Sequence, residues 1–293
     1  MDANKKEIVI NTIDAAYTYI SSGESMTDVK AVEGITSVFE RGSFTAVLGR
    51  NGSGKSTFAK LLNALLFPTR GVVYVDSIST VQEEHIWEIR KTVGMIFQNP
   101  DNQIVGTTVE EDVAFGLENL GVEPAEIRRR VDEVLKSIGM SEFTESQPHH
   151  LSGGQKQKVA IAGILAMKPE CIVLDEATSM LDPSGRKEVI EVMKKLNREE
   201  NITVIHITHH MDEASFADKV IILDEGKIVM QGTPKEIFSQ VEKVKACGLD
   251  VPPVAELMHE LNLLGYNFPK DILTVDEAFE VLKAHFEAAK TDN

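Results

Sequence analysis

A glycine-rich loop lies between a short apolar run and a helix-like run, and this order constrains the fold more than any other feature of the 293-residue chain. Residues 49–56 read Gly-Arg-Asn-Gly-Ser-Gly-Lys-Ser, which fits the pattern G-x-x-x-x-G-K-[ST]. The run 44–48 before the loop is typical of a buried strand, and the run 57–66 after it predicts a helix. The sequence therefore predicts an α/β domain that binds phosphate.

The residue types of this loop suit a nucleoside triphosphate. Glycines allow backbone conformations that are closed to other residues, so successive N–H groups can turn inward around phosphates. We expect Lys55 to reach the β- and γ-phosphates and the Ser56 hydroxyl to ligate Mg²⁺. A glycine-rich turn that binds nothing is the alternative, and the flanking strand and helix argue against it. The predicted nucleotide-binding residues of the loop are Gly49, Asn51, Gly52, Ser53, Gly54, Lys55, Ser56 and Thr57.

Two adjacent carboxylates, Asp175 and Glu176, follow the apolar run 171–174. Carboxylates at the C-terminal end of a buried strand belong to the ligand crevice of an open α/β sheet. Asp175 is expected to hold Mg²⁺, and Glu176 is expected to orient or deprotonate the attacking water. A solvated strand end is the alternative for this pair.

Residues 151–155 read Leu-Ser-Gly-Gly-Gln, and apolar residues then recur with helical spacing up to residue 167. Ser152 is a good N-cap, and two glycines bring backbone N–H groups close to a ligand. The N-terminus of such a helix suits a γ-phosphate. A flexible linker is the alternative, and the helical spacing downstream argues against it.

These three motifs resemble those of the nucleotide-binding subunits of ABC transporters, over about residues 5–235. The resemblance implies a P-loop NTPase fold with an N-terminal antiparallel β layer, a helical insert and a small C-terminal helical domain. In that family the signature Leu-Ser-Gly-Gly-Gln of one subunit closes over the ATP that another subunit holds. The resemblance thus implies that Ser152, Gly153, Gly154 and Gln155 contact ATP across a dimer interface.

Four further positions match the family pattern. Gln98 resembles the glutamine that senses Mg²⁺ and the attacking water, and Asp182 resembles the aspartate that acts across the dimer. His209 is similar to the histidine that contacts the γ-phosphate, although the residues alone do not distinguish it from its neighbour His210. Tyr19 aligns with the aromatic residue that stacks on adenine, and packing in the core is its alternative.

The run 175–183, Asp-Glu-Ala-Thr-Ser-Met-Leu-Asp-Pro, has Ala177 where many ABC proteins carry proline. With the segments 97–103 and 109–116, it resembles the first of the two paired ATPases of energy-coupling factor transporters. The resemblance implies ATP hydrolysis that powers import of vitamins or transition-metal ions. It also implies three partners: a second ATPase that is a paralogue rather than a copy, a transmembrane coupling subunit and a substrate-binding membrane subunit.

The segment 109–116 begins with the acidic residues Glu110, Glu111 and Asp112. We expect them to receive arginines from a coupling helix of the transmembrane subunit. A solvated helix start that is favourable with its own dipole explains the same residues.

The net charge of −16, from 46 acidic and 30 basic residues, argues against a nucleic-acid partner. Apolar runs are shorter than the about 18 to 20 residues that a membrane span needs, and the sequence suggests no secretion signal. Cys171 and Cys247 are the two cysteines, which favours a reduced compartment. The expected location is the cytoplasmic face of the cell membrane.

The domain boundaries are expected near residue 240. Residues 1–240 form the nucleotide-binding domain, with its helical subdomain at about 99–167. Residues 241–293 form a helical domain with helices at 253–264 and 274–290, the second of which has a capping box. We expect this domain to pair subunits, and packing on its own subunit is the alternative.

Three other functions are alternatives for a chain with these motifs. A soluble ABC-type ATPase that acts on a non-transport partner usually has two cassettes or long coiled coils, and this chain has neither pattern. A P-loop kinase would not need the Leu-Ser-Gly-Gly-Gln motif. A scaffold that binds nucleotide without hydrolysis is excluded only if Glu176 and His209 are functional.

Overall fold

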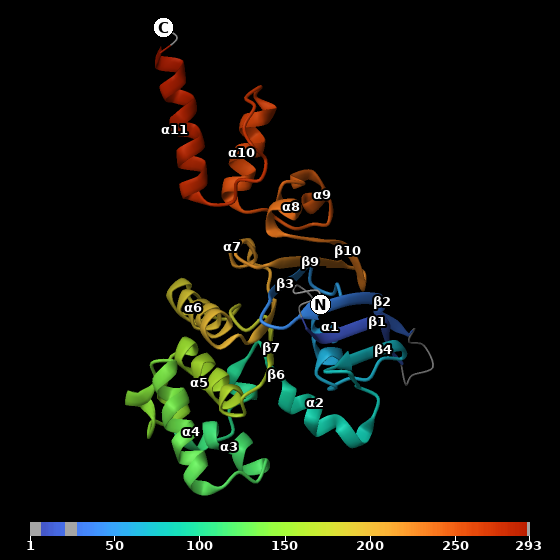
Figure 1. Cartoon of the computed structure of the whole chain (residues 1–293), viewed down its shortest axis with the longest axis vertical. Coiled ribbons are helices and arrows are strands. Elements are labelled where there is room, and N and C mark those ends of the chain that lie inside the picture. The colour runs from blue at the N-terminus through green and yellow to red at the C-terminus, as the bar shows by residue number, and fades with distance from the viewer. Residues whose placement is uncertain (1–6, 21–27, 292–293) are drawn as a thin grey trace, which may run out of the picture.

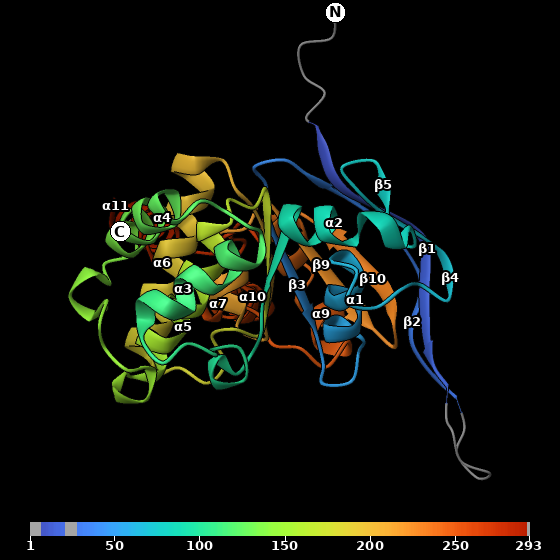
Figure 2. The same cartoon turned by 90° about the horizontal axis from the view of Figure 1, so that it is seen from below.

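The computed structural model describes residues 7–20 and 28–291, with side chains up to residue 287. The described residues form two sheets, with helices between the sheets and on the far side of the larger one (Figures 1 and 2). The helix α1 (Lys55–Leu62) lies between the two sheets, and a group of longer helices covers the far face of the larger sheet (Figure 2). The predicted P-loop α/β fold is therefore confirmed.

The larger sheet has the strand order β10-β9-β3-β8-β7-β6. The neighbours from β9 to β6 pair in parallel, and β9 and β10 form an antiparallel hairpin. Strands β3, β7 and β8 are buried along their whole length, as expected for parallel strands covered on both faces. The strands are β3 (Phe44–Gly49), β6 (Val93–Ile96), β7 (Cys171–Asp175), β8 (Thr203–Ile207), β9 (Lys219–Asp224) and β10 (Lys227–Gly232).

The smaller sheet is antiparallel, with the order β2-β1-β4-β5. It contains the predicted N-terminal strands together with two strands that come after α1. Its buried face packs on α1, where Phe39 and Phe58 lie with ring centroids 6.3 Å apart. The strands are β1 (Ile8–Tyr19), β2 (Val29–Glu40), β4 (Arg70–Val75) and β5 (Ile78–Ser79).

The helix α1 ends earlier than the predicted run 57–66. It stops at Leu62 because Ala64 adopts a left-handed backbone with φ 55°. The amides of Leu65 and Leu66 then both donate to the carbonyl of Lys60, at 2.9 and 3.0 Å. The apolar spacing continues past the helix because Ala64 and Leu66 pack in or against the core, whereas Leu65 is exposed.

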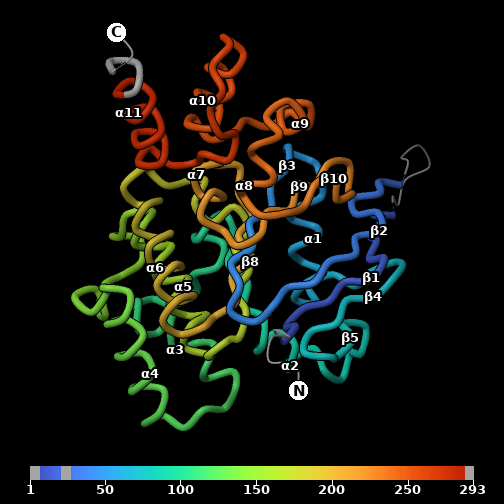
Figure 3. Tube along the Cα trace, turned by 45° about the horizontal axis from the view of Figure 1, so that its top comes forward, coloured from blue at the N-terminus to red at the C-terminus, as the bar shows by residue number. Residues whose placement is uncertain are grey.

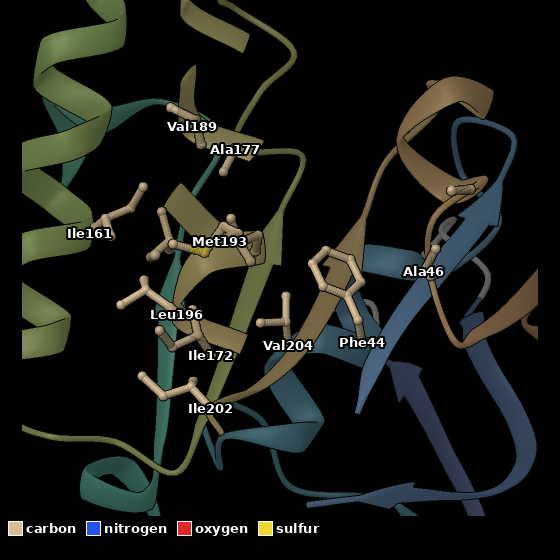
Figure 4. Close-up of a cluster of buried hydrophobic side chains, with 14 of the residues drawn as sticks. Phe44, Ala46, Ile161, Ile172, Ala177, Val189, Met193, Leu196, Ile202 and Val204 are labelled. Atoms are coloured by element: carbon tan, nitrogen blue, oxygen red, sulfur yellow. The ribbon is translucent and has the colours of Figure 1, made fainter. Parts of the chain in front are cut away.

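The far face of the larger sheet is covered by α6 and by a helical group that contains α3, α4 and α5. Met193 and Leu196 of α6 lie against Ile172 and Val204 of the sheet, and Ile161 of α5 packs behind them (Figure 4). These helices therefore share one core with the sheet. The α-helices that follow α1 up to residue 214 are α2 (Ile86–Thr92), α3 (Val109–Asn119), α4 (Pro124–Ser137), α5 (Gly153–Ala166), α6 (Pro183–Glu200) and α7 (Met211–Ala214).

The C-terminal helices are α8 (Pro234–Phe238), α9 (Val241–Ala246), α10 (Pro253–Leu263) and α11 (Val275–Thr291). The helices α8 and α9 pack into the large core through side chains such as Phe238 and Val244, whereas α10 and α11 form a small core of their own around Met258 and Phe268. Both helices extend from the end of the molecule opposite α3 and α4 (Figures 1 and 3). The boundary near residue 240 stays a prediction.

The predicted capping box of α11 is confirmed. Thr274 Oγ1 accepts a hydrogen bond from the Glu277 amide at 3.2 Å, and the Glu277 carboxylate accepts one from the Thr274 amide at 3.1 Å. No helix in the ranges 7–20 and 28–291 has both the length and the apolar composition needed to cross a membrane.

Candidate active site

The glycine-rich loop connects the end of β3 to the start of α1, as the sequence predicts. Gly54 caps α1 with φ 99°, and an added Cβ there would lie 2.1 Å from the backbone oxygen of Ala31. The loop is therefore closed tightly against β2, and only glycine fits at this point. Gly52 also has a positive φ of 81°, but nothing lies within 4 Å of its added Cβ.

The Lys55 ammonium is buried at the mouth of the loop, with 4% of its side chain exposed. It donates hydrogen bonds to the carbonyls of Gly49 at 2.8 Å and Arg50 at 3.0 Å. It also forms an ion pair with Glu176 Oε1 at 3.3 Å. The phosphate loop and the predicted catalytic carboxylate thus face each other across a single salt bridge.

Ser56 lies next to Asp175 at the adjoining strand end. The Ser56 hydroxyl donates to Asp175 Oδ1 at 2.8 Å. Burial raises the pKa of Asp175, although the Ser56 hydrogen bond acts in the opposite direction. A hydroxyl and a carboxylate held side by side form an oxygen donor set of the kind that Mg²⁺ prefers.

This burial leads to a prediction for pH dependence. A raised pKa means that the folded state disfavours the charged carboxylate of Asp175. The charge therefore lowers the free energy of unfolding above the pKa of the folded state, and it has no such effect below the pKa of the unfolded state. Asp175→Asn is therefore expected to raise the melting temperature of the nucleotide-free protein at pH 8 but not at pH 3. Thermal melts across this range test the expectation, with Asp271→Asn at an exposed position as the control. An equal shift at both pH values would contradict it.

Gln98 and Glu176 lie at the ends of β6 and β7, which are neighbours in the sheet. Gln98 Nε2 donates to Glu176 Oε2 at 3.4 Å and to Ser179 Oγ at 3.0 Å. Glu176 has a left-handed backbone with φ 51°, which is costly for a residue with a β-carbon. Such strain at a strand end is typical of functional residues, and here it turns the carboxylate toward Lys55.

His209 and His210 follow β8, and the structure places them differently. His209 lines a hollow of about 650 Å³ together with Gln98 and Glu176. His210 instead accepts a hydrogen bond from Arg186 Nη1 at 2.7 Å, and burial lowers its pKa. The geometry therefore favours His209 as the histidine that faces a bound phosphate.

Tyr19 lies at the rim of a second hollow, of about 470 Å³, which the phosphate loop also lines. Its side chain is 41% exposed, so it does not pack in the core. Its hydroxyl lies 3.3 Å from Thr57 Oγ1, and its ring meets the Tyr17 ring edge-on at 4.8 Å. This exposure agrees with the predicted role of Tyr19 as a platform for adenine.

The Leu-Ser-Gly-Gly-Gln segment forms the start of α5. Ser152 Oγ accepts from the Gln155 amide at 3.3 Å, and Gln155 Oε1 accepts from the Ser152 amide at 2.9 Å, which is a capping box. Asp182 caps α6 by accepting from the Gly185 amide at 3.3 Å, and Gly154 packs beside Gly185. Neither this segment nor Asp182 lines the two hollows around the phosphate loop.

The helices α1 and α5 lie on opposite faces of the larger sheet. Side chains of α1, such as Phe58, belong to the core on one face, and side chains of α5, such as Ile161, belong to the core on the other face. The structure thus brings together the loop, Gln98, Asp175, Glu176 and His209, and it leaves the Ser152 helix outside this group. Within one chain, the Leu-Ser-Gly-Gly-Gln segment therefore does not line the hollows around the phosphate loop.

The acidic start of α3 is mostly used within the chain. The Glu111 carboxylate accepts from the Thr107 hydroxyl, which lowers its pKa, and also completes a capping box with Thr108. Asp112 accepts from the amides of Val105 at 2.7 Å and Gly106 at 3.0 Å. Local capping therefore accounts for these two residues, whereas Glu110 forms an interhelical ion pair with Arg128 at 2.8 Å.

Sequence reasoning missed one part of this site. The loop between α9 and α10 lines the hollow beside Glu176 and His209, through residues 248–250. An added Cβ at Gly248 would lie 2.6 Å from Cδ of Arg50, so this loop touches the phosphate loop itself. No motif marks these residues, because the contact depends on how the C-terminal segment folds back.

The phosphate loop, the carboxylate pair and the Leu-Ser-Gly-Gly-Gln segment define an ATP-binding protein of the ABC type. Comparisons with known families confirm this class. The family model described as ABC transporter matches residues 32–179. The chain belongs to the ABC transporter family of ATP-binding proteins, and within it to the energy-coupling factor group. It is 57% identical over 274 residues to the energy-coupling factor transporter ATP-binding protein EcfA1 of Caldanaerobacter subterraneus subsp. tengcongensis, covering 94% of this chain and 98% of that one.

Solved structures agree with this assignment. The structure of cbiO1 from Clostridium perfringens, described as part of the ABC transporter complex cbiONQ, matches with a TM-score of 0.73 and 36% identity, covering 87% of this chain and 100% of that chain. The ATP-binding cassette MJ0796, solved as a dimer in a post-hydrolysis state with ADP and Pi, matches with a TM-score of 0.69 and 32% identity. This match covers 77% of this chain and 98% of that chain.

Proposed function

We propose that this chain forms one half of an ATP-dependent dimer in which each ATP lies between the phosphate loop of one subunit and the Ser152 helix of the other. As an energy-coupling factor ATPase, the chain binds and hydrolyses ATP to power an ABC importer. The main observation that supports this dimer is that the phosphate loop and the Ser152 helix lie on opposite faces of one sheet. ATP binding then closes the pair, since the nucleotide makes contacts that exist only in the closed state, and hydrolysis removes them.

We assign the roles at the site as follows. Lys55 binds the β- and γ-phosphates, and Glu176 deprotonates or orients the attacking water. His209 contacts the γ-phosphate, and Tyr19 stacks on adenine. Mg²⁺ would be held by Ser56, Asp175 and Gln98, where it would neutralise charge on the phosphates. The Ser56–Asp175 hydrogen bond supports this donor set, because it already holds two oxygen ligands side by side.

We assign the remaining contacts across the dimer by the same reasoning. The capped N-terminus of α5 presents backbone N–H groups, which suit the γ-phosphate of the partner's ATP. Asp182 follows the Glu176 segment closely and caps α6, so it would act between the two sites of the dimer. The residues proposed to contact the partner's nucleotide or its site are Ser152, Gly153, Gly154, Gln155 and Asp182.

The proposed partners are a paralogous second ATPase, a transmembrane coupling subunit and a substrate-binding membrane subunit, with vitamins or transition-metal ions as cargo at the cytoplasmic face of the membrane. The similar protein cbiO1 is part of an ABC transporter complex, which supports membrane partners for this chain. We assign the α10–α11 unit to subunit pairing. Its exposed apolar side chains support this assignment, among them Leu264 at 76% and Phe279 at 59% exposure.

The proposed contact with the coupling subunit centres on Glu110. A hollow of about 480 Å³ lies between α3 and α4, and it is lined by Glu110, Arg128 and apolar side chains that include Val122 and Ile127. Glu111 also lines this hollow, but its carboxylate is used by the helix cap. An arginine from the coupling subunit would thus replace Arg128 at the Glu110 carboxylate.

The experiment is co-purification with the membrane subunits encoded by the source organism, followed by uptake in vesicles. Wild type is expected to bring down the membrane subunits, and Glu110→Lys is expected to lose at least ten-fold of both co-purified partner and uptake while ATP affinity stays unchanged. Asp132→Lys is the matched control, because Asp132 also pairs with Arg128, at 3.4 Å, but does not line the hollow. Unchanged co-purification and uptake in Glu110→Lys would dismiss the acidic contact, and a wild type without membrane partners would dismiss the transport function.

A further inference from the structure

Glu213 in α7 is a buried carboxylate at the sheet edge that carries the active site. Its side chain is 3% exposed, and it lines neither of the hollows at the site. Its Oε2 atom accepts three hydrogen bonds: from His206 Nε2 at 2.8 Å, from the Thr208 hydroxyl at 2.5 Å and from the Thr178 hydroxyl at 3.2 Å. One oxygen therefore gathers three donors from two different segments.

Each of these segments leads directly to a proposed catalytic group. Thr208 precedes His209, and its hydroxyl, while donating to Glu213, accepts a hydrogen bond from the His210 amide at 3.0 Å. This pair of bonds holds the backbone on both sides of His209. Thr178 is two residues after Glu176, in the turn closed by the bond from the Ser179 amide to the Glu176 carbonyl at 3.0 Å.

A third segment approaches the same carboxylate. Arg186 in the first turns of α6 has Nε 3.9 Å from Glu213 Oε1, and its Nη1 donates to His210. Asp182 caps this helix, so the segment proposed to act across the dimer is tied to the same centre. Glu213 thus lies where the turns after β7 and β8 and the start of α6 meet.

Burying a carboxylate is costly unless hydrogen bonds replace the lost water. Burial raises the pKa of Glu213, but the hydrogen bonds from His206 and Thr208 outweigh it, so the net effect is a lowered pKa. Hydrogen bonds to an ionised acceptor are about twice as strong as those between neutral groups. The ionised carboxylate therefore stabilises the two turns more than a neutral group of the same shape would.

We infer that Glu213 is a positioning residue for ATP hydrolysis, which fixes the turns that carry Glu176 and His209 relative to each other without touching the nucleotide. This inference rests on the roles proposed above for those two residues. A shift of about 1 Å in a reacting group can reduce turnover by about 100-fold, so the carboxylate matters for the chemical step. Nucleotide binding depends on the glycine-rich loop and is expected to be unaffected.

The test is steady-state ATP hydrolysis by the Glu213→Gln protein, with nucleotide affinity measured separately. The amide keeps the shape of the carboxylate, but it is a weaker acceptor and places an NH₂ group toward Arg186. A decrease of kcat by at least ten-fold is expected, with the KM for ATP within two-fold of wild type. Thr208→Val removes one donor and should lower kcat in the same way, whereas Thr208→Ser keeps the hydroxyl and should restore it.

Asp212→Asn is the matched control, because Asp212 is the exposed acid next to Glu213 on the same helix. It is expected to hydrolyse ATP like wild type. If Glu213→Gln or Thr208→Val folds with wild-type kcat, the inference is wrong, and equal loss in Thr208→Val and Thr208→Ser would also overturn it. If the wild-type protein hydrolyses ATP and Glu176→Gln does not, the proposed function stands. A wild-type kcat in Glu213→Gln would then contradict only the inference about Glu213.

Discussion

Hydrolysis of ATP by Glu176→Gln is expected to fall by about two to four orders of magnitude, the range that removal of a general base produces. The amide keeps the volume of the carboxylate and an oxygen that can accept from Gln98, but it cannot take a proton and carries no charge toward Lys55. ATP binding is expected to persist, because the loop that cradles the phosphates is unchanged. Phosphate release and equilibrium binding of ATP measure the two effects separately.

The same protein is expected to accumulate as a closed dimer with ATP, since hydrolysis removes the closing contacts in the proposed cycle. Glu170→Gln is the matched control, because Glu170 borders the opposite end of β7, is exposed and pairs with Arg41. It should hydrolyse ATP at the wild-type rate. If Glu176→Gln lost ATP binding while turnover per bound nucleotide stayed unchanged, the assignment of Glu176 as the base would be wrong.

Gly54→Ala is expected to lower the free energy of unfolding by about 3 kcal/mol or more and to abolish ATP binding. A left-handed backbone costs a residue with a β-carbon about 1 to 3 kcal/mol. The added carbon would also lie 2.1 Å from the Ala31 backbone oxygen, so β2 or the loop must move. Either movement displaces the amides that surround the phosphates. Chemical denaturation and ATP titration measure the two losses.

Gly52→Ala separates backbone strain from steric overlap. Gly52 has a positive φ of 81°, close to that of Gly54, but its added Cβ would meet no atom within 4 Å. It is therefore expected to cost only the conformational strain, about 1 to 3 kcal/mol, with the fold and most of the ATP affinity retained. Equal losses in the two variants would show that the contact with Ala31 is not what makes Gly54 necessary.

Local sequence was sufficient for the parts of the site that lie on consecutive residues. The strand, loop and helix around Lys55 follow from apolar spacing and glycines, and the carboxylates at 175 and 176 follow from the end of an apolar strand. The structure joins both through the Ser56–Asp175 hydrogen bond. The parallel order of β3, β8 and β7 makes this meeting possible, because parallel strands end at the same edge of a sheet.

Other features depend on contacts between distant segments and could not be predicted. The end of α1 at Leu62 is set by a left-handed Ala64, a residue with no preference for that conformation. The contact of the acidic residues of α3 with a partner stays a prediction, and only the folded chain shows that Glu111 and Asp112 accept hydrogen bonds from amides of the preceding loop. Glu213 belongs to no motif used in the prediction, and only the folded chain shows that three donors surround it.

The loop 248–250 connects the C-terminal helices to the candidate active site. It forms part of the wall of the hollow beside Glu176, and Gly248 lies against Arg50 of the phosphate loop. A protein trimmed after β10 would lose part of the wall of this hollow together with the C-terminal helices. Glu176 and His209 would then be more exposed to water on that side. Turnover measured on such a shortened protein would therefore describe a more exposed site than the site of the 293-residue chain.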